Sequence, residues 1–242
     1  MMKRMIGISL WVILWPSLVF GALDEQPFIC MIGDSLIASH DWDASFEGLS
    51  VKNYGRIGEK SRGVIKQVSG IAQKRNIQKV FIMVGINDLW HSSLRMPGRV
   101  RLFLTKHFPA IFSILEKWIF SFNHFMLKNV VAPKLLNNYE ALIRTIQTSG
   151  PETEIYIHSL LPLNEALFYQ NYENRIDRQL IRDINEALSE LALKYDVLFV
   201  DLYSSMTTPE HQLPAHYTED GIHLNGAGYQ VWENILRPLI ES

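Results

Sequence analysis

Four short blocks of the sequence carry the groups that acyl transfer to a serine needs. They are Gly33-Asp34-Ser35-Leu36, Asn53-Tyr54-Gly55-Arg56-Ile57-Gly58, Gly85-Ile86-Asn87-Asp88 and Asp220-Gly221-Ile222-His223, in that order along the chain. Such chemistry needs a nucleophile, a general base with its carboxylate, and hydrogen-bond donors for the negative oxygen of the tetrahedral intermediate. One such block alone is more typical of a turn. Four in this order indicate a hydrolytic active site.

Asp220 and His223 have the spacing of a general base and its orienting carboxylate. A neutral imidazole can take the proton of a serine hydroxyl and return it to the leaving group. A neighbouring carboxylate fixes the tautomer and stabilises the imidazolium. Because a tight turn brings side chains three residues apart to one side, we expect Asp220 to orient His223. We then expect His223 to act on Ser35. Taken by itself, Ser35 could also be a helix N-cap.

These blocks resemble those of the SGNH hydrolases, the GDSL family of esterases and lipases, over about residues 28–232. The resemblance implies a serine esterase that forms an acyl-enzyme on Ser35, with His223 and Asp220 completing the triad and with no metal or organic cofactor. It leaves the substrate open between O-acetyl glycans and acyl lipids such as lysophospholipids, and it leaves open an O-acyltransferase that acylates a glycan. The oxyanion-hole donors that it implies are the backbone N–H groups of Ser35 and Gly58 and the side-chain amide of Asn87.

The other polar residues of the blocks are predicted to be structural. We expect Asp34, Asn53 and Asp88 to hydrogen-bond the backbone of the loops near the site. A competing interpretation is a metal-dependent hydrolase, because His211 and His216 lie close in sequence to Asp220 and His223 and such clusters can bind zinc. Their spacing matches no known metal motif. A fold that only binds glycans is a further alternative, but no essential block is missing.

Composition and charge narrow the class of protein. The chain has 242 residues, 48% of them apolar, which suits one domain with a substantial core. A net charge of -2 argues against nucleic acid as a partner. The single cysteine, Cys30, excludes an internal disulfide framework. Nothing in the sequence predicts the oligomeric state.

The first residues have the pattern of an export signal. Lys3 and Arg4 precede an apolar run to Phe20, which small residues follow. We therefore predict a signal peptide over residues 1–21, an exported enzyme (periplasmic or secreted) and a hydrolase domain over residues 25–242. The alternative is an uncleaved segment that anchors the protein in a membrane.

Short apolar runs alternate with longer segments of helical periodicity. Strands are expected over residues 28–32, 50–53, 79–84, 154–159 and 197–202, and helices over residues 63–75, 135–149, 173–195 and 227–240. This alternation predicts an α/β fold, a three-layer α/β/α sandwich around a five-stranded parallel sheet. The family resemblance implies the flavodoxin-like strand order 2-1-3-4-5. In such sheets the ligand crevice lies beyond the carboxyl ends of the strands, where Ser35, Gly58 and Asn87 would lie.

Residues 90–131 form a helical insertion after the third strand that the compact fold does not require. They carry six Lys or Arg, a single acid, Glu116, and half of the phenylalanines of the chain. A helix over residues 110–127 has Glu116 and Lys117 at mid-length, which argues against a membrane span. We expect the insertion over or beside the active-site mouth. It is either a cap that lines an acyl pocket or touches a membrane surface, or a second small core.

Overall fold

Runs of Ile, Val and Phe form one parallel sheet in the computed structural model, which describes residues 26–72, 74 and 76–242. The expected signal peptide lies outside the described residues. The strands are β1 (Phe28–Gly33), β2 (Val51–Asn53), β3 (Ile77–Met83), β4 (Glu154–His158) and β5 (Leu198–Val200). Their order is β2-β1-β3-β4-β5 and every neighbouring pair is parallel, which confirms the predicted order.

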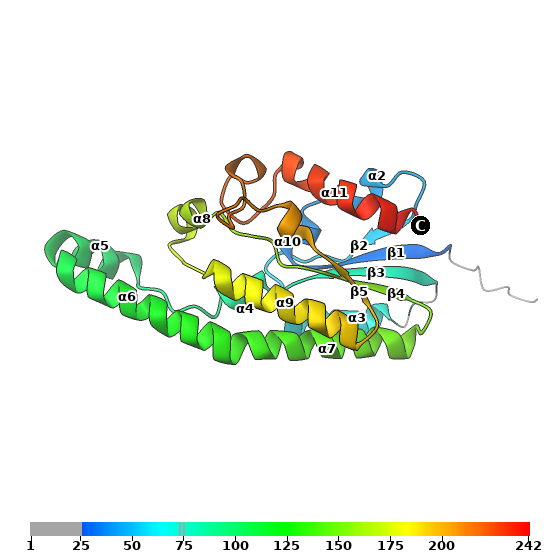
Figure 1. Ribbon diagram of the computed structural model, residues 1–242, viewed down its shortest axis with the longest axis horizontal. Coiled ribbons are helices and arrows are strands. Elements are labelled where there is room, and N and C mark those ends of the chain that lie inside the picture. The colour runs from blue at the N-terminus through cyan, green and yellow to red at the C-terminus, as the bar shows by residue number, and fades with distance from the viewer. Residues whose placement is uncertain (1–25, 73, 75) are drawn as a thin grey trace, which may run out of the picture.

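Helices cover both faces of the sheet and give it the predicted three layers (Figure 1). One face packs against α3 (Ser61–Ile71), α7 (Ala132–Ser149) and α9 (Arg178–Lys194). The other packs against α2 (Trp42–Ser45) and α11 (Gly226–Ile240). Because each face buries its own apolar cluster, the central strands are apolar on both sides and show no alternation.

Several predicted boundaries differ from the observed ones, and capping residues explain two of them. The helix expected over residues 173–195 begins only at Arg178: Glu173 has a left-handed backbone that ends α8 (Glu165–Tyr172), and α9 begins after Asp177, whose side chain accepts from Gln179 N–H. The strand expected to reach residue 202 ends at Val200. Asp201 caps the short helix α10 (Leu202–Ser205), so the apolar run contains a strand end and a helix start.

The insertion forms a helical arm. After α4 (Ile86–Trp90) the chain makes α5 (Gly98–His107) and α6 (Pro109–Met126), and α6 continues through a π-helical turn (Leu127–Val131) into α7. We call α5 and α6 together the arm. Figure 1 shows it projecting from the body beyond the carboxyl ends of the strands.

The arm is not a second core, so that alternative is wrong. α5 buries none of its side chains, and α6 buries only Asn123. Across the described ranges, no helix is both long enough and apolar enough to span a bilayer.

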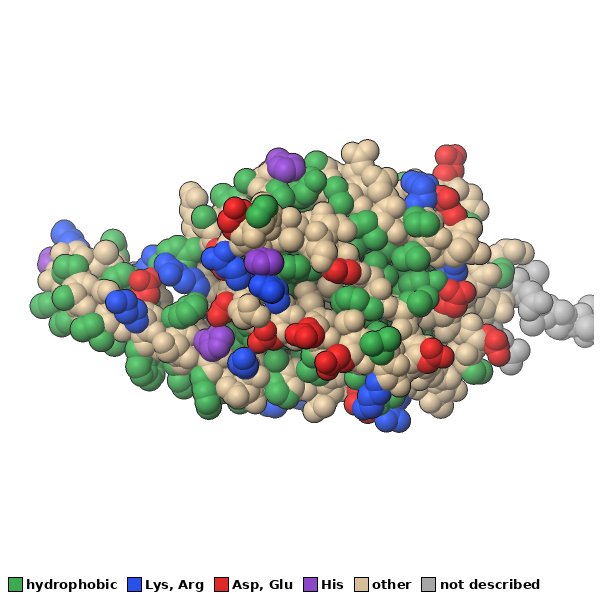
Figure 2. All heavy atoms as spheres, viewed as in Figure 1, with side chains coloured by type: hydrophobic (Ala, Val, Ile, Leu, Met, Phe, Trp, Pro, Cys, Tyr) green, Lys and Arg blue, Asp and Glu red, His purple; other side chains and the backbone are tan. Residues whose placement is uncertain are grey.

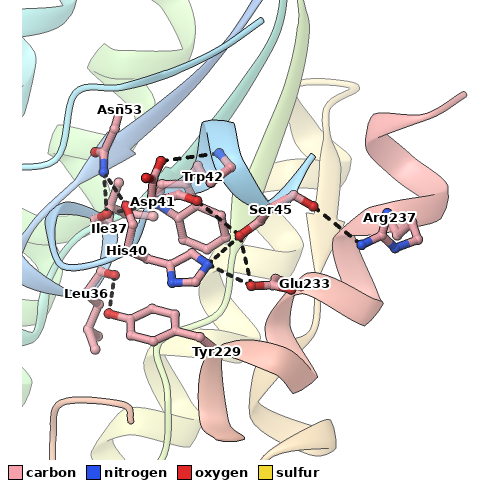
Figure 3. Close-up of polar contacts among 11 residues, drawn as sticks. Leu36, Ile37, His40, Asp41, Trp42, Ser45, Asn53, Tyr229, Glu233 and Arg237 are labelled. Carbon is pink, nitrogen blue, oxygen red and sulfur yellow. Dashed lines mark hydrogen bonds and ion pairs between the residues drawn. The ribbon is translucent and has the colours of Figure 1, made fainter. Parts of the chain in front are cut away.

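A polar cluster ties the start of the fold to its last helix (Figure 3). Tyr229 donates from its hydroxyl to the Leu36 carbonyl at 2.7 Å, and its ring stacks on His40 at 4.3 Å. His40 Nε2 lies 2.9 Å from Ser45 Oγ and 2.8 Å from Glu233 Oε1. In a catalytic triad the hydroxyl and the carboxylate contact different nitrogens of the histidine ring. Here Ser45 and Glu233 both contact Nε2 of His40, so these three residues do not have the geometry of a catalytic triad. It braces α11 against the turn that follows β1.

Candidate active site

Ser35 stands at the sharp turn between β1 and α1 (Ser35–Ala38). Asp34 is the N-cap of α1, with its Oδ1 accepting from Leu36 N–H at 3.0 Å. The capping role considered for Ser35 therefore belongs to its neighbour, which leaves the Ser35 hydroxyl available. Gly33 makes the turn possible, because a Cβ there would lie 2.0 Å from the Met83 carbonyl oxygen.

The structure brings Ser35, His223 and Asp220 together in one hydrogen-bonded row. Ser35 Oγ lies 3.0 Å from His223 Nε2, and His223 Nδ1 lies 2.6 Å from Asp220 Oδ2. The other carboxylate oxygen of Asp220 accepts the backbone N–H groups of Ile222 and His223 at 3.0 and 2.8 Å. With Nδ1 facing a carboxylate, the neutral ring carries its proton there and presents an unprotonated Nε2 to the serine. This arrangement can accept the serine proton.

Tyr172 is a fourth member of this row that the sequence did not indicate. Its hydroxyl donates to Asp220 Oδ2 at 2.5 Å, the same oxygen that meets His223. Its ring packs against Trp90 and Phe168, with centroids 4.5 and 5.4 Å away. It lies 48 residues before Asp220, so no local motif could have revealed the contact.

Burial and hydrogen bonding act against each other at Asp220. Burial tends to raise the pKa of this carboxyl, but hydrogen bonds from His223, from Tyr172 and from two backbone N–H groups outweigh it and lower the pKa to about 2. Burial and the hydrogen bond to Asp220 raise the pKa of Tyr172 to about 12. Across the neutral range, a neutral phenol therefore donates to a charged carboxylate.

The expected oxyanion donors lie on two neighbouring segments that contact each other, Gly58 on the loop after β2 and Asn87 at the start of α4. Gly58 has a φ of 73°, and its turn is closed by Glu59 N–H donating to the Arg56 carbonyl at 3.1 Å. Asn87 is buried in the first turn of α4, and its Nδ2 donates to the Glu59 carbonyl at 3.1 Å. That bond uses one of the two amide hydrogens. The roles of both residues in an oxyanion hole stay a prediction.

Asp34, Asn53 and Asp88 hydrogen-bond backbone groups near the site, as predicted. The Asn53 amide donates to the Ile37 carbonyl at 2.9 Å (Figure 3). Asp88 accepts from the backbone N–H and the hydroxyl of Ser61 at 2.9 and 2.7 Å and so anchors the start of α3 beside α4. Burial raises the pKa of Asp34 to about 7.

The histidines of the competing zinc interpretation do not gather into a metal site. His211 Nε2 lies 3.2 Å from Arg182 Nη1, and the ring of His216 lies against that of Tyr217. Over the stretches of chain that the structure describes, no group of three or more His, Cys, Asp or Glu is placed to hold a metal ion. The zinc interpretation is therefore wrong for these residues.

A cavity of about 440 Å³ lies between the arm and the end of α8. Four cations and two acids line it together with neutral polar side chains, and its apolar lining includes Met96, Phe112 and Phe120. Arg101 pairs with Glu173 at 2.8 Å and donates to Tyr169 at 2.6 Å, which fixes the arm on α8. The cations of its lining are Arg95, Arg101, Lys117 and Arg175, and its acids are Glu116 and Glu173.

Comparisons with known proteins agree with this geometry. The family described as GDSL-like Lipase/Acylhydrolase matches residues 31–231. The platelet-activating factor acetylhydrolase IB subunit alpha2 of Rattus norvegicus is 22% identical over 239 residues, which cover 97% of this chain and 84% of the relative. A solved structure from Streptococcus pneumonia, named after platelet activating factor, is 26% identical with a TM-score of 0.69 and covers 91% of this chain and 86% of its own. The GDSL-like lipase of Bacteroides thetaiotaomicron VPI-5482 shares the fold at 18% identity, with a TM-score of 0.63 over 90% of this chain and 88% of its own.

Proposed function

Because this chain belongs to the GDSL-like lipase/acylhydrolase family and is a serine hydrolase of ester bonds, we propose that it works through an acyl-enzyme on Ser35. The observation that carries this proposal is the continuous row from Ser35 Oγ through both ring nitrogens of His223 to Asp220, with steps of 3.0 and 2.6 Å. Both distances are those of hydrogen bonds that can pass a proton.

The proposed reaction has two halves that use the same groups. Ser35 Oγ attacks the ester carbonyl while its proton moves to His223 Nε2, and Asp220 stabilises the imidazolium. The tetrahedral oxygen takes hydrogen bonds from Ser35 N–H, Gly58 N–H and the Asn87 amide. The intermediate expels the alcohol, which receives the proton from Nε2. Water then attacks the acyl-enzyme along the same path and releases the carboxylic acid and free Ser35.

We propose an acyl lipid as the substrate class. The cavity beside α8 combines apolar walls with surplus positive charge, which suits an amphiphile that has an acyl chain and an anionic headgroup. Helix α8 contacts both the cavity and the catalytic row: Tyr169 lines the cavity, and Tyr172 donates to Asp220. The name of the rat relative, an acetylhydrolase of platelet-activating factor, supports the same class.

The nucleophile is tested by Ser35→Ala, with Ser39→Ala as the matched control. Ser39 is an exposed serine four residues further on, at the C-cap of α1. We expect Ser35→Ala to lower kcat on p-nitrophenyl acetate by roughly 10⁶, while Ser39→Ala stays at the parent value. A fluorophosphonate should add one mass increment to the parent protein and none to Ser35→Ala. Retention of most activity by Ser35→Ala would refute the acyl-enzyme.

The substrate class is tested separately with the parent enzyme. We expect the kcat/KM for p-nitrophenyl esters to rise with acyl length, and a lysophospholipid to be cleaved faster than an O-acetylated sugar. A preference for the acetylated sugar together with rejection of long chains would replace the lipid proposal by a glycan esterase and leave the acyl-enzyme intact.

A further inference from the structure

The arm exposes most of the large apolar side chains that the described part of the chain leaves at its surface. Leu102 on α5 is 72% exposed, and Trp118 and Phe125 on α6 are 58% and 59% exposed. Figure 2 shows hydrophobic side chains along the outer edge of the arm, with Lys and Arg beside them. Apolar patches of this extent on soluble proteins mark interaction surfaces.

On α6 most of these side chains form one continuous stripe. Ile111, Leu115, Trp118, Phe122 and Phe125 recur at alternating spacings of four and three, so they share one face of the helix. Trp118 and Phe122 stack with centroids 5.4 Å apart. The residues of α6 that line the cavity lie on the opposite face. The stripe therefore faces away from the cavity, and its five side chains stay between 37% and 59% exposed.

The charges around the stripe are positive and mostly unpaired. Arg99 and Lys106 on α5 lie outside the cavity lining and make no ion pair with any residue that the structure describes, whereas Lys128 at the base of the arm pairs with Asp183 at 3.2 Å. The one acid of the arm accepts a hydrogen bond from Tyr169 instead. This cationic surface stands out on a chain whose net charge is -2.

We propose that the stripe and its flanking cations dock the enzyme on an anionic lipid bilayer. Aromatic and aliphatic side chains enter the boundary between headgroups and acyl chains, while Lys and Arg contact the anionic headgroups. A second copy of the chain is the less suitable occupant, because two arms packed through their stripes would bring cations against cations. The arm projects at the carboxyl ends of the strands, so docking brings the Ser35 end of the molecule to the lipid (Figure 1).

The first test measures binding of the full chain to vesicles of phosphatidylcholine with and without 30% phosphatidylglycerol. We expect Trp118→Ser/Phe122→Ser to weaken binding to the anionic vesicles at least tenfold. The matched control is Leu193→Ser, which removes an 81% exposed leucine from α9 and should leave binding unchanged. All variants keep the same N-terminal segment, so any binding by that segment cancels in the comparison.

The second test removes charge and leaves the stripe intact. Arg99→Gln/Lys106→Gln should weaken binding to anionic vesicles by about 30-fold, or about fivefold for each charge, and should leave binding to neutral vesicles unchanged. Arg62→Gln/Lys66→Gln makes the same charge change on two exposed positions of α3 and serves as the control.

Three outcomes would overturn the docking proposal. The first is no binding of the parent protein to vesicles, and the second is equal binding by the arm variants and the control variants. The third is a parent protein that does not bind vesicles but forms a dimer in light scattering, which Trp118→Ser/Phe122→Ser dissociates. Binding is measured without turnover, and Ser35→Ala should bind as the parent does. Arm variants should cleave the water-soluble p-nitrophenyl acetate at the parent rate. Failure of docking is therefore distinguishable from failure of the acyl-enzyme proposal.

Discussion

Tyr172→Phe tests whether the phenol that meets Asp220 positions the catalytic row. The substitution keeps the ring against Trp90 and removes only the hydroxyl, which donates to Asp220 Oδ2 at 2.5 Å. A hydrogen bond to a charged group contributes about 1.5–3 kcal/mol. Asp220 keeps its other donors and its side chain is 24% exposed, so water can partly replace the phenol. We therefore expect Tyr172→Phe to lose transition-state stabilisation near the lower end of that range, about 1.4 kcal/mol, which is a tenfold fall in kcat/KM.

The pH profile separates positioning from simple packing. The hydrogen bond from Tyr172 is one of those that lower the pKa of Asp220 to about 2, against the effect of burial. Without it the pKa rises toward the ordinary value of 3.8, so the carboxylate begins to protonate at a higher pH. The kcat/KM of Tyr172→Phe should consequently fall further below the parent as the pH drops from 6 to 4. Rates on p-nitrophenyl acetate over that range measure the effect.

Tyr169→Phe is the matched control for this prediction. It removes a hydroxyl from the same helix, but one that bonds Glu116 and Arg101 and not the triad. We expect its kcat/KM on p-nitrophenyl acetate to equal that of the parent at every pH. If Tyr172→Phe stays within twofold of the parent and keeps its pH profile, or if Tyr169→Phe loses as much, Tyr172 does not position Asp220.

Three further predictions concern other parts of the site and the core. Asn87→Ala should lower kcat by about 10²–10³ with KM little changed, whereas an effect on KM alone would make Asn87 a substrate-binding residue. Gly33→Ala should yield no folded protein, because its Cβ would lie 2.0 Å from a carbonyl oxygen. Gly58→Ala has open space around its Cβ and a φ of 73°, so it should lower the free energy of unfolding in urea by only about 1–2 kcal/mol. Equal stability of the two variants would contradict the structure. Burial lowers the pKa of His158 to about 3, so below pH 6.5 the unfolded chain binds a proton that the folded chain does not, and stability falls with falling pH. His158→Phe should therefore gain about 2 kcal/mol relative to the parent between pH 7 and pH 5. A constant difference in unfolding free energy would refute this assignment.

Parts of the candidate active site could be predicted from sequence because their geometry is local, although Ser35 and His223 meet from positions 188 residues apart. Asp220 and His223 meet across one tight turn, and Asp34 caps the helix that starts at Ser35. The strand order followed from the family resemblance, and the buried apolar runs predicted which segments are strands. Helix and strand ends were less predictable, as Leu202 shows: hydrophobicity marks a residue as buried but does not say in which element.

Only the tertiary structure decided which distant side chains meet and which apolar ones stay exposed. Tyr172 reaches Asp220 because α8 packs beside the loop before α11, a contact that no spacing encodes. His211 and His216 are near His223 in sequence, but His211 contacts Arg182 and His216 contacts Tyr217. The metal cluster that the sequence offered as an alternative is therefore absent from the described residues. The phenylalanines of the arm fit a buried core and an exposed stripe equally well in sequence. Periodicity specifies which residues share a face of a helix, whereas the packing of the whole chain determines whether anything covers that face.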